Sequence, residues 1–279
     1  MRSLLIQALE DATLRGVRNR MNGKVLRFFY SSITVAEMEA RNIRHDSTEL
    51  WTRVVQPALW LLVFGTTFNS IRALPVGGSF SYIQFITPGI LAQSVLFIAI
   101  FYGITVVWER DVGIFTRLLS TPSPRSSIVF GKALASGLRG IFQAVMIFAL
   151  AIAIGVGIRL NPFDIAGVFA VIVLFAICFS SLSMLLASYM RTRDRMMGIG
   201  QALTMPLFFA SNAIYPLSVM PVWLQYIAIA NPLSYVVDAM RSMLITGNYT
   251  NLPIDIIALL VATVAFVSLA SVTIKKLLE

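Results

Sequence analysis

Long apolar runs alternate with short polar segments along most of this chain. A membrane-spanning helix needs about 20 consecutive, mostly apolar residues, and six stretches of this kind occur in the sequence. They cover residues 54–71, 85–108, 141–158, 165–190, 197–215 and 256–274. This pattern predicts an all-α membrane protein with six transmembrane helices.

The residues before the first apolar run are of mixed polarity. Residues 1–30 contain no apolar run of signal-peptide length followed by a small-residue cleavage site. A short amphipathic helix and a mobile cytosolic extension are about equally compatible with them. Residues 33–50 are compatible with a helix but too polar to span a membrane, so they predict an interfacial helix. The chain thus divides into an extension, 1–30, and one membrane domain, 31–279.

The distribution of basic residues between the apolar runs predicts their orientation. With six crossings, the excess of Lys and Arg falls on one side, which marks the cytoplasmic side. Both termini are therefore expected in the cytoplasm. Arg139, near the start of the third run, is expected to extend to the membrane interface. The basic residues on the cytoplasmic side include Arg110, Arg117, Arg125, Lys132, Arg191, Arg193, Arg195, Lys275 and Lys276.

One further apolar stretch, residues 214–240, differs from a transmembrane helix. Pro216, Pro221 and Pro232 interrupt it, and proline breaks helices because it lacks a backbone donor. A seventh crossing would also place the C-terminal lysines outside, against the charge bias. The stretch therefore predicts re-entrant or interfacial helices on the outer side, between spans 5 and 6.

Composition agrees with insertion into a membrane. Of the 279 residues, 57% are hydrophobic and 13% are charged, whereas soluble domains carry about 25% charged residues. The mean hydropathy is +0.80, and these values exclude a soluble enzyme. A net charge of +9 would suggest nucleic acid as the partner of a soluble chain. Here the basic residues lie between apolar runs, so no nucleic-acid partner is expected.

Catalytic and nucleotide-binding motifs are missing from the sequence. The phosphate loop GxxxxGK[ST], whose backbone amides and lysine hold nucleotide phosphates, does not occur. The lone histidine, His45, precedes the first apolar run, and no Asp or Glu lies in the middle of a run. Neither catalytic residues nor a metal site are therefore expected, and the chain is not predicted to be an enzyme.

The loop after the second apolar run carries the most informative pattern. Residues 109–122 read ERDVGIFTRLLSTP. In a short helix, Ile114, Phe115, Leu118 and Leu119 form one apolar face, and Pro122 stops the helix. Such a helix can dock in a groove of a partner protein or rest on lipid headgroups.

Two strings in this sequence resemble the ABC transporter type-2 permease family. Residues 109–134, ERDVGIFTRLLSTPSPRSSIVFGKAL, are similar to the family's loop, commonly ERExGTLexLLxTPvsrxxxxxGK. Residues 219–241, VMPVWLQYIAIANPLSYVVDAMR, are similar to its outer segment, commonly lPxWLqxxaxxNPltyxxdaxR. Ile114 and Phe115 depart from the common Thr-Leu pair. The resemblance covers roughly residue 33 to the C terminus and is nearest to daunorubicin-resistance and nodulation-factor exporters.

The resemblance implies the membrane subunit of an ATP-driven exporter in the plasma (inner) membrane of a prokaryote. Two permease copies, as a homodimer or a related heterodimer, would form the pathway within the lipid bilayer. Separate nucleotide-binding subunits would hydrolyse ATP with Mg, so this chain itself would need no cofactor.

The resemblance also assigns roles to both strings. The loop would supply a cytosolic coupling helix between spans 2 and 3, with contacts to the ATPase from Glu109, Arg110, Asp111, Gly113, Phe115, Arg117, Leu118, Leu119, Thr121 and Pro122. The outer segment would form an outer gate, with Pro221, Trp223, Leu224, Asn231, Pro232, Tyr235, Asp238 and Arg241.

Polar side chains inside the apolar runs allow two interpretations. They could line a pathway for amphipathic cargo, namely a drug, a lipid or a lipid-linked glycan, or they could hydrogen-bond to neighbouring helices. These side chains are Gln93, Gln143, Gln201 and Asn212. The alternative function is a stand-alone secondary transporter or channel, although such proteins usually carry ionisable groups near the bilayer midplane.

Overall fold

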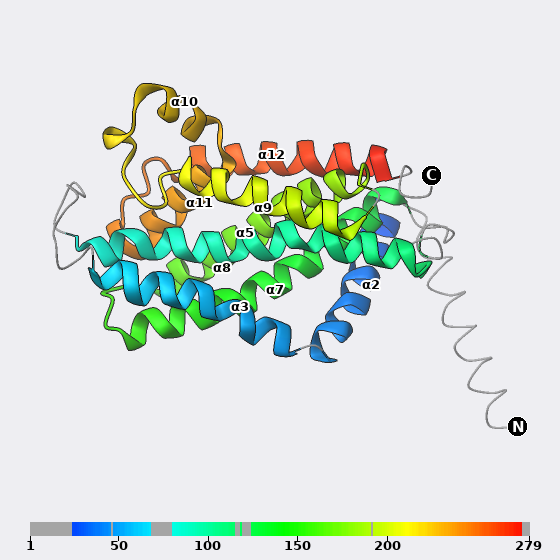
Figure 1. Ribbon diagram of the computed structural model, residues 1–279, viewed down its shortest axis with the longest axis horizontal. Helices are drawn as coiled ribbons and strands as arrows, with labels where there is room; N and C mark the ends of the chain where they lie inside the picture. Colours follow the sequence, from blue (N-terminus) through cyan, green and yellow to red (C-terminus); the bar gives the residue numbers. More distant parts are fainter. Residues whose placement is uncertain are drawn as a thin grey trace, which may run out of the picture.

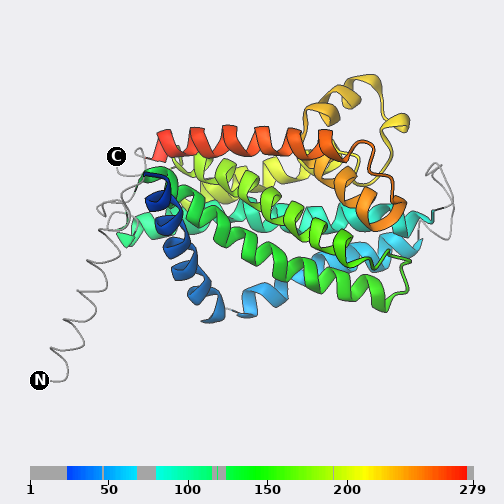
Figure 2. The ribbon, with the colours of Figure 1, turned by 180° about the vertical axis from the view of Figure 1, so that it is seen from behind.

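The computed structural model describes residues 24–45, 47–67, 80–114, 118, 124–190 and 192–274. In these ranges the chain forms helices joined by turns, with no strand, which confirms the predicted all-α class. The long helices run roughly side by side along the long axis of the molecule (Figure 1). α2 crosses one end of this bundle, and α10 projects at the opposite end in both views (Figures 1 and 2).

Four of the described helices are long and apolar enough to cross a membrane. They are α5 (Tyr82–Asp111), α7 (Arg125–Ala153), α8 (Pro162–Ala187) and α12 (Leu252–Thr273). α5, α7 and α8 pack on one another, and α12 lies along α8. Phe175 and Phe179 of α8 are buried in the main core, where their rings meet edge to face.

The helices that correspond to the other two apolar runs are less regular. α3 (Ser47–Leu59) contains Pro57 and continues into a π-helical turn, η1 (Trp60–Gly65). α9 (Arg193–Phe209) has 17 residues and contains Pro206. It ends before the predicted limit of residue 215, because the chain turns at Ala210. In both helices the proline removes one intrahelical donor, which accounts for the local irregularity.

The third apolar run differs most from its prediction. The apolar pattern predicts a span over residues 141–158, whereas α7 begins at Arg125 and ends at Ala153. The part of α7 before residue 141 carries Lys132 and Arg139, which interrupt the apolar pattern but form ion pairs within the protein. The helix ends ahead of Gly155, whose φ of 79° lies in the left-handed region that favours glycine.

α2 (Lys24–His45) lies across the bundle and packs chiefly against α7. It begins within the segment that the sequence assigns to the extension, and residues 1–23 lie outside the described residues. Gly131 of α7 permits the close approach, because a Cβ there would lie 2.6 Å from the carbonyl oxygen of Ser32. The buried face of α2 follows helical spacing and includes Ser32, Val35, Ala36 and Glu39.

The proline-rich stretch, residues 214–240, forms short helices, as its sequence predicts. They are η2 (Leu217–Val219), α10 (Val222–Ala230) and α11 (Pro232–Arg241), which continues into the π-helical turn η3 (Ser242–Thr246). Pro216 and Pro221 lie at the residue before a helix, and Pro232 is the first residue of one. At these positions proline fixes a favourable φ and loses no intrahelical hydrogen bond.

Candidate functional site

A buried ion cluster lies where α2, α5 and α7 meet. The Lys132 ammonium on α7 donates to Glu39 Oε1 on α2 and to Glu109 Oε2 on α5, each at 2.5 Å. Arg139 Nη2, further along α7, lies 3.8 Å from Glu39 Oε2. These four side chains, named the charged joint below, combine two carboxylates with two cations. One ammonium thus holds three helices that are distant in sequence.

The charges of this cluster depend on one another. The Lys132 side chain has no solvent exposure, and an unpaired charge at such a position would be strongly unfavourable. Burial by itself would raise the pKa of Glu39, but Lys132 and Arg139 lower that pKa below its ordinary value. Glu39 is therefore ionised at neutral pH. The guanidinium of Arg139 also lies over the Tyr102 ring, 5.1 Å from its centroid.

The charged joint departs from the sequence-based expectation. Arg139, which is expected to extend to the membrane interface, packs between Glu39 and Tyr102 with a side chain that is 19% exposed. Sequence reasoning also missed Lys132 and Glu39 as site residues. One signal was available, since Lys132 and Arg139 lie seven residues apart and therefore share a helical face. Two cations on one face of a largely apolar helix indicate carboxylates on a neighbouring helix.

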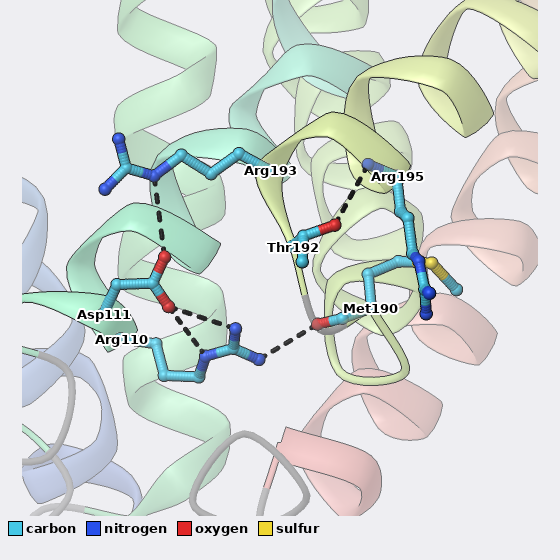
Figure 3. A network of polar contacts seen from close by, with 6 residues as sticks. All are labelled: Arg110, Asp111, Met190, Thr192, Arg193 and Arg195. Atoms are coloured by element: carbon cyan, nitrogen blue, oxygen red, sulfur yellow. Dashed lines mark hydrogen bonds and ion pairs between the residues drawn. The ribbon is translucent and has the colours of Figure 1, made fainter.

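The last residues of α5 point in different directions. Glu109 is 6% exposed and faces the charged joint. Arg110 donates to the carbonyl oxygen of Met190 at 2.9 Å and pairs with Asp111 at 3.1 Å. Asp111 also lies 3.6 Å from Arg193 Nε (Figure 3). The end of α5 is therefore connected to α2 and α7 on one side and to the α8–α9 turn on the other.

The α5–α7 loop begins at this branching point. Val112 follows α5, and Gly113 adopts φ 76°, a left-handed conformation that commonly ends a helix. Leu118, from the predicted apolar face, is half-buried. The remaining predicted coupling residues lie outside the described residues: Phe115, Arg117, Leu119, Thr121 and Pro122.

At the opposite end of the bundle, Arg241 connects α11 to its neighbours. Its guanidinium pairs with Asp238 at 3.0 Å and donates to the carbonyl oxygen of Asn212 at 2.8 Å. It also lies over the Phe85 ring of α5, 3.9 Å from the centroid. The sequence assigns Asp238 and Arg241 to the outer gate, and here they form a packed contact between α11, α5 and the chain that follows α9.

Asn231 joins α10, α11 and α9. Its Oδ1 accepts from the amide of Leu233 at 3.0 Å, which caps α11. Its Nδ2 donates to the carbonyl oxygens of Leu207 and Ala210 at 2.7 and 2.9 Å. These carbonyls belong to the end of α9, so a single buried side chain satisfies the ends of two helices. Tyr235, also assigned to the gate, donates its hydroxyl to the carbonyl oxygen of Ile229 at 2.7 Å.

The remaining gate residues belong to α10 or precede it. Pro221 and Trp223 are exposed, Trp223 to 64%, and Leu224 is half-buried. Tyr226 on the same helix is 71% exposed. Residues 217–230 carry no charged side chain, so α10 presents an uncharged aromatic surface where it projects from the bundle (Figures 1 and 2).

The four predicted pathway residues have different surroundings. Gln93 and Gln143 are each 1% exposed, and Gln143 Nε2 donates to the carbonyl oxygen of Arg53 at 3.2 Å. Among the described residues, neither polar atom of the Gln93 amide has a hydrogen-bond partner. Asn212 is buried, whereas Gln201 lies on an exposed face of α9. Within the described ranges, no group of three or more His, Cys, Asp or Glu could hold a metal ion.

Comparison with known proteins identifies the family. The family model described as ABC-2 type transporter matches residues 31–245. The transport permease ycf38 of Cyanophora paradoxa is 30% identical over 238 residues, which cover 84% of this chain and 81% of that protein. The daunorubicin resistance ABC transporter permease protein DrrB1 of Streptomyces coeruleorubidus is 25% identical, covering 72% and 70%. The inner membrane transport permease YadH of Escherichia coli K12 is 26% identical, covering 71% and 77%.

These matches confirm the resemblance carried by the loop and the outer segment. Members of this family are membrane subunits of ABC transporters that lack the ATPase domain and generally act with nucleotide-binding subunits. With its apolar helices and a family match over most of its length, this chain belongs to the ABC-2 type transporter family of membrane permeases.

Proposed function

We propose that this chain is the membrane subunit of an ATP-driven exporter whose nucleotide-binding subunit docks on the α5–α7 loop. The observation that carries the proposal is the contact between the two roots of this loop. Its two roots, the end of α5 and the early turns of α7, are joined by the Glu109–Lys132 ion pair. A loop fixed in this way can transmit force, which a loop resting on headgroups does not need to do.

The proposed topology has six crossings, with both termini on the cytoplasmic side of a prokaryotic plasma membrane. α3 with η1 and α9 would complete the set begun by the four long helices. The helical segment 47–67 has a length of about 30 Å at 1.5 Å per residue, enough to cross the hydrocarbon core. The exposed side chains of α3 and η1 are suited to lipid or to a second permease copy, and include Val55, Leu59, Leu62, Val63 and Phe64.

The proposed cargo is amphipathic: a drug, a lipid or a lipid-linked glycan. The unpaired amide of buried Gln93 favours a pathway role for that residue, because an internal polar group without a partner is costly unless water or cargo reaches it. The hydrogen bond from Gln143 to α3 favours a packing role instead. The outer gate would comprise α10 and α11, with α10 at headgroup depth, which Trp and Tyr prefer.

ATP hydrolysis in a reconstituted complex tests the division of labour. The purified chain should hydrolyse no ATP, because it lacks a phosphate loop. Adding its nucleotide-binding subunit should produce a stable complex that hydrolyses ATP with Mg. If the pure permease shows ATPase activity that no substitution in the permease abolishes, a contaminating ATPase is the source. Activity lost on substituting the permease itself would contradict the proposal.

Cysteine labelling tests the topology. Replacing Cys178 with Ala removes the single native thiol, which is buried. In that background, Ser120→Cys should label from the cytoplasmic side and Ser218→Cys from the outside. Labelling of both positions from the same side would exclude the proposed arrangement of crossings.

A further inference from the structure

The Glu109–Lys132 ion pair closes the base of the α5–α7 loop. The two residues are separated by 23 positions, yet their side chains meet at 2.5 Å. Glu109 belongs to the last turn of α5, and Lys132 to the early part of α7. A displacement of the loop therefore moves both of its roots together.

α2 is attached to the same ammonium. Glu39 binds Lys132 at 2.5 Å, and both of its oxygens are engaged because the second lies 3.8 Å from Arg139. Beside this contact the backbones of α2 and α7 approach each other at Gly131. α2 thus has two adjacent attachments to the root of the loop in α7. One is the ion pair with Lys132, and the other is the close backbone contact at Gly131.

The ion pair between α5 and the α8–α9 turn is weaker than the charged joint. Arg110 also donates to the carbonyl oxygen of Met190 at 2.9 Å, and Met196 of α9 lies in the same buried cluster as Tyr102 of α5. The ion pair joins Asp111 and Arg193 at 3.6 Å, with side chains that are 38% and 45% exposed (Figure 3). Exposed pairs of this kind are screened by water and salt and contribute little. The charged joint is shielded from solvent, so its Coulomb interactions are much stronger. Of the ion pairs at the end of α5, those of the charged joint therefore hold it most strongly, and they connect it to α2 and α7.

We propose that Glu39, Glu109 and Lys132 form a positioning joint that makes α2, the end of α5 and the start of α7 move as one body when the α5–α7 loop is displaced. This inference rests on the proposed function for the source of the displacement, a docked nucleotide-binding subunit. The rigidity of the joint itself requires no partner, so it can be tested separately.

The first test uses the permease without a partner. Spin labels at Met38→Cys on α2 and Val112→Cys after α5, both exposed positions, report the distance across the joint in a Cys178→Ala background. Pulsed EPR should give one narrow distance distribution. Lys132→Met should at least double its width, whereas Lys132→Arg, which retains a cation able to bind both carboxylates, should keep it narrow. Ile33→Ala alters an exposed side chain of the same helix and should change nothing.

Two milder variants guard against misfolding of Lys132→Met. Glu39→Gln and Glu109→Gln each leave Lys132 one carboxylate. Each weakens the link to α2 or α5, respectively, because a neutral amide oxygen accepts a weaker hydrogen bond from the ammonium than a carboxylate does. Each should widen the distribution while the protein elutes as a single species with unchanged helical content. A folded Lys132→Met, Glu39→Gln and Glu109→Gln series with the width of the unaltered chain would overturn the proposed joint.

The second test adds the nucleotide-binding subunit with ATP, Mg and vanadate. In the unaltered chain, trapping should leave the 38–112 distance unchanged. The distance between labels at Val112→Cys and Met197→Cys is measured in the same samples to report movement relative to α9. A shift of the 38–112 distance on trapping would overturn the joint as a rigid body. Failure of any ATPase to bind the unaltered chain would contradict the proposed function. The widths of the distance distributions measured without a partner would still test whether the joint is rigid.

Discussion

At the α2 end of the bundle a single buried ammonium holds three helices, whereas at the α10 end the helices are held by side chains that bind backbone carbonyls. Lys132 has two carboxylate partners and no solvent exposure. Arg241 instead divides its contacts between Asp238, a backbone carbonyl and the Phe85 ring. Asp238 itself is 39% exposed, so at the α10 end one partner of the ion pair can exchange its bond for water.

This difference separates a stiff end from an adaptable one. Loss of any member of the charged joint leaves a buried charge with too few partners. At the α10 end, loss of Arg241 leaves a carboxylate, Asp238, that is already 39% exposed, near a helix whose Trp223 and Tyr226 are exposed. The stiff end is the one from which the proposed ATPase-docking loop emerges, and the adaptable end carries the proposed outer gate.

The largest expected effect follows from Lys132→Met. The substitution leaves Glu109 buried without its cation, and breaking a buried pair in this way costs about 3–5 kcal/mol. Denaturant unfolding in detergent should show that loss. Arg125→Met, an exposed cation at the start of the same helix, should stay within about 0.5 kcal/mol. A Lys132→Met protein as stable as the Arg125→Met control would refute the claim that the charged joint stabilises the α2 end of the bundle.

Arg241→Met provides the matching test at the α10 end. It removes the pair with Asp238 and the hydrogen bond to Asn212, but the exposed part of Asp238 can be hydrated in their place. The expected loss is about 2–3 kcal/mol, smaller than for Lys132→Met, in the same unfolding experiment. If Arg241→Met lowers the free energy of unfolding more than Lys132→Met does, the α2 end is not the more strongly held end of the bundle.

Gly131→Ala tests the steric attachment of α2 without changing a charge. A Cβ at this position would lie 2.6 Å from a backbone oxygen of α2, so the helices must separate. Overpacking of this kind costs about 2 kcal/mol. Gly198→Ala is the matched control, because no atom lies within 4 Å of its added Cβ, and the better helix propensity of Ala should leave it neutral or slightly stabilised. Equal stabilities of the two variants would exclude a close α2–α7 contact.

Asn231→Ala should give the smallest loss of the four. It removes the cap of α11 and the two hydrogen bonds to the end of α9. About 1–2 kcal/mol is expected, since a cap and partly hydratable carbonyls are affected. Hydrogen exchange should locate the change at the start of α11 and the end of α9. Faster exchange at the α2 end instead would show that the two ends are not independent.

The sequence predicts the regular parts of this fold well. Four apolar runs correspond to long helices, and the prolines at 216, 221 and 232 delimit the short outer helices. The part of α7 before residue 141 escapes prediction because an apolar window treats Lys132 and Arg139 as interruptions. Whether a cation is buried depends on its partner, and Glu39 lies 93 residues from Lys132. No local pattern encodes that distance.

The candidate site was predicted unevenly for the same reason. The two sequence motifs, residues 109–134 and 219–241, lie at opposite ends of the bundle (Figure 1). A motif, however, does not give the direction in which its side chains point. Glu109 was assigned to the ATPase contact, and its carboxylate is occupied by Lys132 within the chain. Asn231 and Arg241 were assigned to a gate, and they make the packing contacts that join its helices.

The central claim is that the nucleotide-binding subunit docks on the α5–α7 loop, and its association with the permease tests this most directly. The test variant alters this loop, and the control variant alters α10 at the other end of the bundle. Phe115→Ala/Leu118→Ala alters the apolar face predicted for the α5–α7 loop. Val222→Ala/Tyr226→Ala alters exposed apolar side chains of α10. Each large side chain buried in a partner groove contributes about 1.5–3 kcal/mol, so the loop variant should weaken association by roughly 100-fold or more.

The measurement is co-purification of the ATPase with each variant over a range of concentrations, with insertion checked by cysteine labelling. The account predicts that the loop variant loses the ATPase and that the α10 variant retains it at the affinity of the unaltered chain. Full association of a correctly inserted Phe115→Ala/Leu118→Ala variant would contradict the assignment of the docking site to this end of the molecule.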